Sequence, residues 1–162
     1  MSKQTVVVTG ASGFVGKYVT ADLIRAGYRA RGTIRDLAKA DTLRRVIDEM
    51  VGREVGDDLE LTQADILQDA HWPEIMAGAA AVMHVATVIM STEPKHPDEV
   101  VRPALEGTER VLRFAAAAGV KRVILTSSVA TVGYGLGHTS GTRVYTEADF
   151  TNLEAMEHTW SY

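Results

Sequence analysis

The stretch VVVTGASGFVGKYV (residues 6–19) joins a run of β-branched residues to an amphipathic segment through three glycines. Gly10, Gly13 and Gly16 follow the spacing G-x-x-G-x-x-G. A tight turn from strand to helix needs a residue that tolerates positive φ, a backbone that a phosphate can approach, and a small residue where the helix packs on the strand. The N–H groups at the helix start then attract an anion. The stretch therefore predicts a strand–turn–helix unit that holds the pyrophosphate of a dinucleotide.

A phosphate-binding P-loop is the alternative interpretation of this turn, because Lys17 follows Gly16. The first glycine of that motif would fall at Ala11, and Tyr18 stands where a magnesium-binding hydroxyl is required. Both positions exclude the P-loop.

Beyond the turn, short apolar runs alternate with amphipathic segments. The expected strands are residues 5–9, 28–34, 59–66, 80–86 and 122–127, and the expected helices are residues 14–26, 37–51, 72–77 and 97–118. Strands that alternate with helices pair in parallel through crossover connections. The pattern predicts an α/β fold with helices on both faces of a parallel sheet. Pro103 inside the last helix is expected to kink it.

The composition is that of an ordinary globular protein. The chain has 162 residues, of which 46% are apolar and 23% charged, and this length suits one domain, residues 1–162. A net charge of −4 argues against nucleic-acid binding. The absence of cysteine excludes a disulfide scaffold, and the five histidines show no metal-ligand spacing. With no signal peptide and no apolar run of transmembrane length, a cytoplasmic protein without a membrane partner is expected.

Further motifs give the chain a family resemblance. They are GTIRD (residues 32–36), ADI (64–66), MHVAT (83–87), VVRPALEGTERVL (100–112) and VKRVILTSSVATVGYG (120–135). Together with the glycine turn, they resemble the extended short-chain dehydrogenase/reductases (the NAD-dependent epimerase/dehydratase family), in particular the dihydroflavonol-reductase-like branch with its aldehyde and ketone reductases. The resemblance implies a Rossmann-type doubly wound sheet of order 3-2-1-4-5. It also implies further strands and a smaller substrate domain that this sequence does not contain.

The second strand ends TIRD, which bears on the choice of cofactor. A carboxylate such as Asp36 suits the ribose 2′-hydroxyl of NAD, and an arginine such as Arg35 suits the 2′-phosphate of NADP. Arg35 comes first, and in the look-alike branch an arginine here accompanies NADPH, so NADP is favoured over NAD. The cofactor-binding residues that the resemblance implies, besides Arg35, are Thr9, Gly10, Gly13, Phe14, Val15, Gly16, Asp65, Ile66, Ala86, Thr87 and Thr126. His84 lies within an apolar strand and is expected to be structural.

The fifth strand ends ILTSSVATV, and the resemblance makes Ser128 the hydrogen-bond donor to a substrate oxygen. The catalytic tyrosine should follow some 25 to 35 residues later in a Y-x-x-x-K motif. Asp149 stands four residues after Tyr145, which excludes Tyr145, whereas Tyr162 lies 34 residues beyond Ser128 and is expected to donate the proton. The sequence ends there without the lysine, which predicts little or no turnover by this chain alone. Thr151 and Glu154 predict a capping box that opens a final helix carrying Tyr162.

The expected function is therefore NADP-dependent reduction of a small-molecule aldehyde or ketone. Two alternatives stay open at this point: a nucleotide-sugar epimerase or dehydratase of the same fold, and a non-catalytic module that binds NAD(P). The fifth strand would be a bare sheet edge, which predicts self-association as a homo-oligomer, or low solubility.

Overall fold

A five-stranded parallel sheet forms the centre of the computed structural model, which describes residues 3–89, 92, 94–134 and 142–155. The strands are β1 (Thr5–Thr9), β2 (Arg29–Ile34), β3 (Leu59–Gln63), β4 (Ala79–His84) and β5 (Val123–Leu125). Their order is β3-β2-β1-β4-β5, and every neighbouring pair is parallel. The predicted Rossmann-type sheet order is confirmed.

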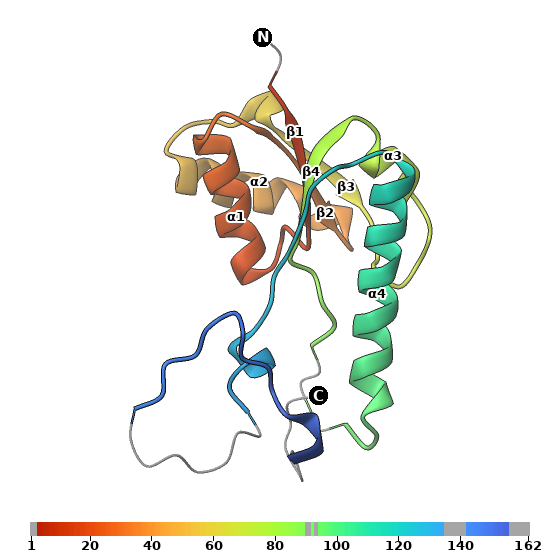
Figure 1. Cartoon of the computed structure of the whole chain (residues 1–162). Helices are drawn as coiled ribbons and strands as arrows, with labels where there is room; N and C mark the ends of the chain where they lie inside the picture. Colours follow the sequence, from red (N-terminus) through yellow and green to blue (C-terminus); the bar gives the residue numbers. More distant parts are fainter. Residues whose placement is uncertain (1–2, 90–91, 93, 135–141, 156–162) are drawn as a thin grey trace.

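The helices lie in two layers, one on each face of the sheet (Figure 1). They are α1 (Phe14–Arg25), α2 (Ala40–Val51), α3 (Trp72–Met76) and α4 (Asp98–Ala117). Val8 of β1 packs into a core with Ile24 of α1 and Ile47 of α2. Its neighbour Val7 packs on the other face with Trp72 of α3 and Val111 of α4. Because successive strand residues point to opposite faces, a run of valines in β1 supplies both cores.

Three of the strands end earlier than predicted. β3 ends at Gln63, β4 at His84 and β5 at Leu125, so the residues that follow each strand leave the ladder. Register pairs Thr9 with His84 and His84 with Leu125, which aligns the carboxyl ends of β1, β4 and β5. The expected site residues of these segments therefore lie in the loops at one edge of the sheet, where ligands bind in doubly wound folds.

Helix α4 continues through Pro103 without interruption, so the expected kink does not break it. Its 20 residues span about 30 Å at 1.5 Å per residue, which exceeds the length of the strands. Its buried residues are Gly107, Val111 and Ala115, which run from the middle of the helix towards its carboxyl end. The amino-terminal half extends past the carboxyl edge of the sheet (Figure 1).

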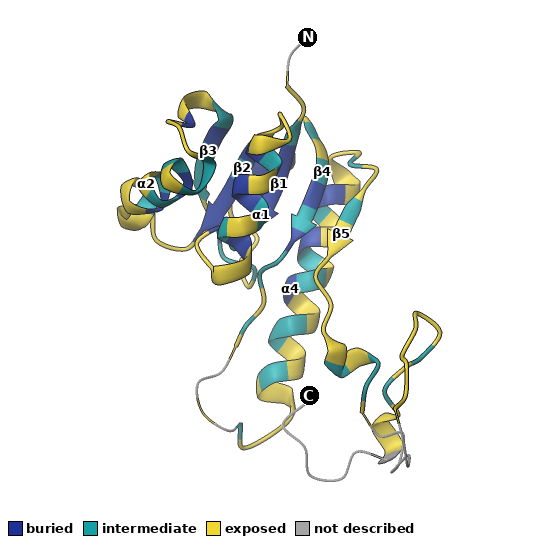
Figure 2. Ribbon diagram, turned by 90° about the vertical axis from the view of Figure 1, so that its left-hand side faces the viewer, coloured by how far each residue is buried: buried dark blue, intermediate teal, exposed yellow. Residues whose placement is uncertain are grey.

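The described residues after β5 also lie beyond the carboxyl edge, and they are largely exposed (Figure 2). The capping box expected at Thr151 is wrong. The Thr151 hydroxyl instead donates to the Ala130 carbonyl and accepts from the Tyr134 N–H at 3.2 Å. Asn152 caps the short 3₁₀ turn Leu153–Ala155, with its side-chain oxygen 3.1 Å from the Glu154 nitrogen. Thr151 thus ties two parts of the segment together.

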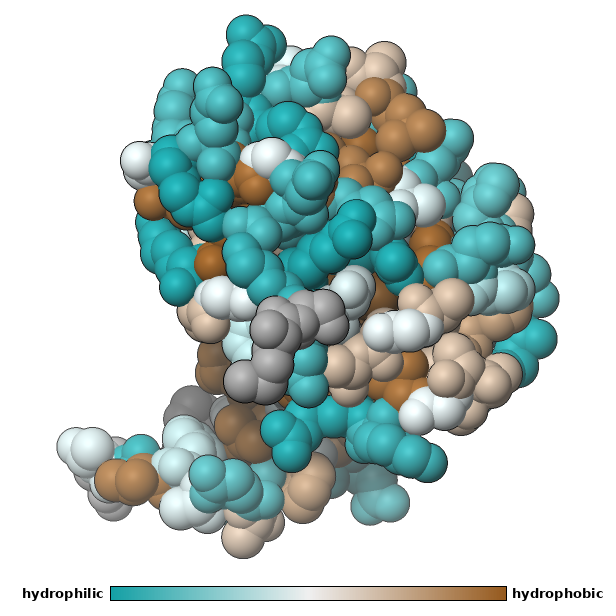
Figure 3. Space-filling model, turned by 90° about the horizontal axis from the view of Figure 1, so that it is seen from above, coloured by the Kyte–Doolittle hydropathy of each residue, from teal (hydrophilic) through white to brown (hydrophobic). Residues whose placement is uncertain are grey.

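The opposite, amino-terminal edge of the sheet faces the viewer in Figure 3. Hydrophilic side chains cover much of this face, with smaller apolar areas between them. The chain enters β2, β4 and β5 here through turns that contain Gly27, Gly78 and Gly119, each at positive φ. The two edges of the sheet therefore differ: one carries tight turns, the other the loops that bear the expected site.

Candidate dinucleotide-binding site

The glycine turn between β1 and α1 leaves no room for side chains at its crossing points. Gly10 has a φ of +69°, and a Cβ there would lie 3.1 Å from the Cβ of Ala86. A Cβ on Gly16 would lie 2.2 Å from the Gly10 carbonyl oxygen, and one on Gly13 would lie 3.2 Å from it. The Gly13 N–H closes the turn by donating to that oxygen at 2.9 Å. The packing thus requires glycine at positions 10 and 16 and disfavours a side chain at 13.

Helix α1 begins without a side-chain cap, since Gly13 occupies the N-cap position. The first N–H of the helix to find a helical partner is that of Lys17, which donates to the Gly13 carbonyl. The N–H groups of Phe14 and Val15 precede it in the first turn, and both residues are exposed. A helix start with unpaired donors and a partial positive charge suits a phosphate.

Thr9 lies at the end of β1 and joins that strand to β4 through a buried polar cluster. Its Oγ1 accepts from the N–H groups of Val85 at 3.0 Å and Ala86 at 2.9 Å. Its one proton therefore goes to Nδ1 of His84, 2.8 Å away, which places the histidine proton on Nε2. Thr9 is fully buried, so its side chain supports the site and does not line it.

His84 is 1% exposed, and burial lowers its pKa below the ordinary value of 6.5. A neutral, buried imidazole with one hydroxyl partner matches the structural role expected for it. The next two residues along, Ala86 and Thr87, leave the strand. Ala86 is half-buried against Gly10, and Thr87 is exposed at the carboxyl edge.

Arg35 and Asp36 follow β2 and differ in how their side chains are used. The Asp36 Oδ1 accepts from the Ala38 N–H at 3.0 Å and caps the 3₁₀ turn Leu37–Lys39. The Arg35 guanidinium forms no hydrogen bond or ion pair with the described part of the chain. Its backbone oxygen accepts from Nε2 of Gln63 at 3.0 Å. Arg35 therefore has a free cationic group at the carboxyl edge, whereas Asp36 is partly used by the backbone.

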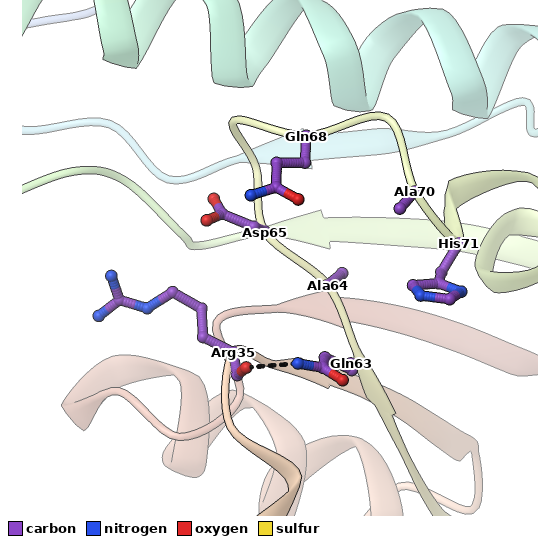
Figure 4. A pocket seen from close by; sticks show the side chains of 7 residues that line it. All are labelled: Arg35, Gln63, Ala64, Asp65, Gln68, Ala70 and His71. Carbon is purple, nitrogen blue, oxygen red and sulfur yellow. Dashed lines mark hydrogen bonds between the residues drawn. The ribbon is translucent and has the colours of Figure 1, made fainter.

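A pocket of about 270 Å³ opens beside Arg35, between the ends of β2 and β3 (Figure 4). Its lining residues come from the segment after β2, the end of β3 and the loop that follows β3: Arg35, Gln63, Ala64, Asp65, Gln68, Ala70 and His71. Arg35 and Asp65 lie on the same side of it (Figure 4). The structure thus brings together two predicted residues that are 30 positions apart in the sequence.

Several residues of this pocket were not predicted. Gln63 orders the Arg35 backbone, and Gln68 lines the pocket from the loop. His71 also lines it and is the one non-glycine residue at positive φ in the described ranges, with φ 68°. Nothing in the sequence signals a left-handed histidine, because the conformation results from how the loop enters α3.

Ser128 follows β5 and has a hydroxyl that is available to a ligand. Its Oγ accepts from the Ala130 N–H at 3.2 Å, which leaves its own proton free to donate. The Ser127 hydroxyl is instead paired with that of Thr131 at 3.1 Å. Thr126 precedes both and donates its N–H to the His84 carbonyl, so β5 stays tied to β4 up to this point.

Tyr162, the expected proton donor, lies outside the described residues. Tyr145 is described, and the Arg143 guanidinium lies 5.2 Å from the centre of its ring. No group of three acidic, histidine or cysteine side chains within the described ranges could hold a metal ion. No helix in the same ranges is long and apolar enough to cross a membrane.

These elements fit a dinucleotide along the carboxyl edge. The turn offers a backbone surface without side chains, the start of α1 offers unpaired donors, and Arg35 offers a cation at one end. Ala86, Thr87 and Ser128 lie at the strand ends that continue the edge beyond β1. Such an arrangement can hold two phosphates in the middle, a nucleoside at the β2–β3 end and a reactive ring towards β5.

Comparison with known proteins supports this interpretation. Residues 7–148 match the 3-beta hydroxysteroid dehydrogenase/isomerase family. A dihydroflavonol 4-reductase of Hordeum vulgare is 38% identical over 132 residues, which cover 81% of this chain and 36% of that protein. Aldehyde reductase 2 of Sporidiobolus salmonicolor is 37% identical, over 94% of this chain and 43% of that protein. The chain thus spans less than half the length of these two relatives.

Among solved structures, Gre2 from Candida albicans in complex with NADPH has the same fold. The TM-score is 0.76 at 24% sequence identity, over 97% of this chain and 45% of that one. At this identity the likeness establishes the fold alone, and it agrees with the sheet order described above.

Proposed function

Because the chain belongs to the 3-beta hydroxysteroid dehydrogenase/isomerase family, we propose that it forms the dinucleotide-binding domain of an NADP-dependent reductase acting on an aldehyde or ketone. The observation that carries the proposal is the glycine turn, where the Gly10 oxygen excludes any side chain at Gly16 beside the uncapped start of α1. Residues 1–162 form this one domain. The relatives of known function, a dihydroflavonol 4-reductase and an aldehyde reductase, support an oxidoreductase.

The preference for NADP rests on the side chains that follow β2. Recognition of NAD at this position relies on a carboxylate directed at the ribose, but the Asp36 carboxylate caps the Leu37–Lys39 turn. The Arg35 guanidinium is free of protein partners among the described residues, and its planar fork suits a 2′-phosphate. Arg35 would hold the phosphate, and its position beside the pocket would also let it lie against the adenine ring.

The remaining contacts follow the edge from β3 to β5. Asp65 and Ile66 would meet the adenine edge. The N–H groups of Phe14 and Val15 would bind the pyrophosphate, with Gly10, Gly13 and Gly16 allowing its approach. The central and nicotinamide parts of the cofactor would lie along Ala86, Thr87 and Thr126. The buried Thr9 would hold Ala86 in place through the hydrogen bond from the Ala86 N–H to its hydroxyl oxygen. The nicotinamide, when bound, supplies the hydride that reduces the carbonyl carbon.

The chain's own part in the chemistry is proton donation. Ser128 would donate its free hydroxyl proton in a hydrogen bond to the carbonyl oxygen. Tyr162 would transfer a proton to that oxygen as the alcohol forms, which is the role that the family resemblance implies for a tyrosine at this distance from Ser128. The names of the two relatives point to a carbonyl substrate, a dihydroflavonol in one and an aldehyde in the other. Cytoplasmic location, self-association and the lack of a nucleic-acid partner stay predictions from the sequence.

The cofactor assignment is tested by calorimetric titration of NADPH and NADH into the chain and into Arg35→Ala. NADPH affinity should fall about 10-fold or more, since a charge-assisted contact to phosphate is lost, while NADH affinity should change by less than about threefold. Arg122→Ala removes an exposed arginine at the opposite edge of the sheet and should change neither affinity. An equal loss for both nucleotides would contradict the role of Arg35, and no binding of either would overturn the proposed function.

The chemistry is tested by NADPH oxidation with a panel of aldehydes and ketones, using protein expressed from its complete reading frame. Tyr162→Phe should lower kcat by about 10²–10⁴ while leaving the KM for NADPH unchanged, since proton transfer contributes a factor of that order. Ser128→Ala should also lower kcat. A kcat within a few-fold of the original in Tyr162→Phe would exclude it as the proton donor.

A further inference from the structure

The loop between β3 and α3, residues 64–71, has no strand or helix of its own to fix its shape. It nevertheless carries Asp65 and Ile66, the residues assigned above to the adenine edge. We propose that Gly107 and Arg110 of α4 are positioning residues that hold this loop in the shape that binds the adenine half of the cofactor. The inference rests on the proposed function and adds to it residues that touch neither substrate nor cofactor.

Gly107 sets how closely the loop approaches α4. A Cβ at this position would lie 2.9 Å from Cδ1 of Ile66 and 3.2 Å from its Cγ1. Both distances are shorter than ordinary carbon contacts of about 3.5–4.0 Å. The missing side chain therefore lets the Ile66 side chain lie directly on the backbone of the helix, and a larger residue at position 107 would require that side chain to shift.

Arg110, one turn further along α4, holds the backbone of the same residue. Its Nη1 donates to the Ile66 carbonyl oxygen at 2.7 Å, and its Nε donates to the Asp69 carboxylate. The Arg110 side chain is only 17% exposed, so water competes poorly for these contacts. Ile66 is thus fixed twice from α4, through its side chain by Gly107 and through its carbonyl by Arg110.

Asp69 connects Arg110 to a second arginine. Nη2 of Arg113 lies 3.0 Å from both carboxylate oxygens of Asp69. The hydrogen bonds from Arg110 and then Arg113 lower the pKa of Asp69, so the carboxylate stays charged at neutral pH. The far end of the loop is therefore tied to the same helix face as Ile66.

The loop is also held by α3, so α4 is one of two helices that fix its shape. Nε1 of Trp72 donates to the carbonyls of Gln68 at 2.8 Å and Asp65 at 3.3 Å. Asp65 itself closes a local turn by accepting from the Leu67 N–H at 2.9 Å. Trp72 is completely buried, and its substitution would disturb the core. Asp69 is exposed and Arg110 is partly exposed, and neither belongs to the apolar core, so they can be changed without opening it.

The test measures the affinity of the chain for adenosine 2′,5′-bisphosphate, which represents the adenine half of the cofactor, by calorimetry. Arg110→Gln should weaken binding roughly tenfold, because the contacts that hold the Ile66 carbonyl and Asp69 are lost and the loop is less well ordered. Hydrogen exchange of the Ile66 and Leu67 amides, measured without ligand, should become faster in this variant. Exchange at the Gly13 amide should stay unchanged, which separates loosening of this loop from a general loss of stability.

Asp69→Asn, at a side chain that is 55% exposed, keeps the fold and should give a smaller effect in the same direction. Arg102→Gln is the matched control, since Arg102 lies on α4 and its only ion pair with the described residues is with the exposed Asp98, at 3.4 Å. If the unsubstituted chain binds the bisphosphate and Arg110→Gln binds it equally, the positioning role is overturned and the proposed function stands. If the unsubstituted chain does not bind it, the proposed function fails and the positioning role fails with it.

Discussion

The contact between Thr9 and His84 joins the ends of two central strands, and it depends on the charge of one imidazole. Thr9 Oγ1 has a single proton, which it donates to Nδ1 of His84 because it accepts from Val85 and Ala86. Protonation of Nδ1 would place its N–H against the Thr9 hydroxyl, which also donates, so two donors would face each other in a core where His84 is 1% exposed. The neutral form is thus part of what holds Ala86 against Gly10.

This makes stability depend on pH in a predictable direction. Burial lowers the pKa of folded His84 below 6.5, so between these two values the unfolded chain binds a proton that the folded chain does not. The contribution of His84 is fully present above 6.5 and is lost as the pH falls towards the lowered pKa. Urea unfolding from about pH 7.5 to about pH 5.5 should show a fall with a slope of up to about 1.4 kcal/mol per pH unit.

His84→Asn should reduce that slope, because an amide oxygen can accept from Thr9 without titrating. The variant will be less stable at every pH, since a buried ring is lost, and the slope is therefore the quantity to compare. His71→Asn is the control variant. It replaces an exposed histidine, and asparagine tolerates the positive φ at this position. An unchanged slope in His84→Asn would show that another group carries the pH dependence.

Residues whose role depends on their immediate neighbours in sequence could be predicted. Gly10, Gly13 and Gly16 belong to one short turn, and the steric demand that selects glycine there is local. Arg110 and Gln63 could not be predicted, because their partners, Ile66 and the Arg35 carbonyl, lie 44 and 28 positions away. Asp36 is an intermediate case. The sequence correctly predicts that it follows the second strand, but only the structure shows that its carboxylate caps the following turn.

Among the elements, the short helix α3 depends on a side chain from the sheet. It has only five residues, and Arg31 of β2 reaches its carboxyl end. Nη1 of Arg31 donates to the carbonyls of Ile75 at 2.8 Å and Ala77 at 2.9 Å, and its Nε lies 3.0 Å from Glu60. A helix this short is marginal alone, so its position rests on these contacts and on the buried Trp72.

Arg31→Met should therefore destabilise the chain by about 1–3 kcal/mol, because it leaves two carbonyls and a carboxylate without their donor. The measurement is urea unfolding followed by circular dichroism. Arg29→Met is the matched control: Arg29 lies on the same strand and pairs with the same Glu60, at 3.5 Å and with a side chain that is 44% exposed. Its loss should cost less than about 1 kcal/mol. Equal costs for the two variants would contradict a specific role of Arg31 at α3.

Element types could be predicted because the alternation of apolar runs and amphipathic segments is regular along the chain. The ends of the strands could not. After β3 and β4, apolar residues continue past the last residue of the strand, at Ala64, Ile66, Val85 and Ala86, so the pattern predicts longer strands than the structure has. Ile66, for example, continues the apolar run of β3 but lies on Gly107 of α4.

At the scale of the whole molecule, every described residue assigned to the cofactor lies at or just beneath the carboxyl edge of the sheet. The opposite edge carries the turns at Gly27, Gly78 and Gly119 and none of the assigned residues. Parallel strands make this separation unavoidable, since all their carboxyl ends meet at one edge. The sheet order could be predicted from the family resemblance, whereas the overhang of α4 beyond this edge could not.

The separation of the two edges predicts how NADPH should alter hydrogen exchange. A ligand that binds only the folded chain raises the free energy of global unfolding, by about 2.7 kcal/mol at 100 times its Kd. All amides that exchange through global unfolding therefore exchange more slowly. Amides that exchange by local fluctuation report the binding site itself. Among these, NADPH should slow exchange at Phe14, Val15, Ile66 and Thr87. Amides in the turns at Gly27, Gly78 and Gly119 should keep their rates, since they lie at the far edge.

The same experiment with Arg35→Ala at matched saturation should reproduce the pattern, because Arg35 affects affinity and not the location of the site. Local slowing at the Gly27 and Gly78 turns without slowing at Phe14 and Val15 would place the nucleotide at the wrong edge and contradict the site.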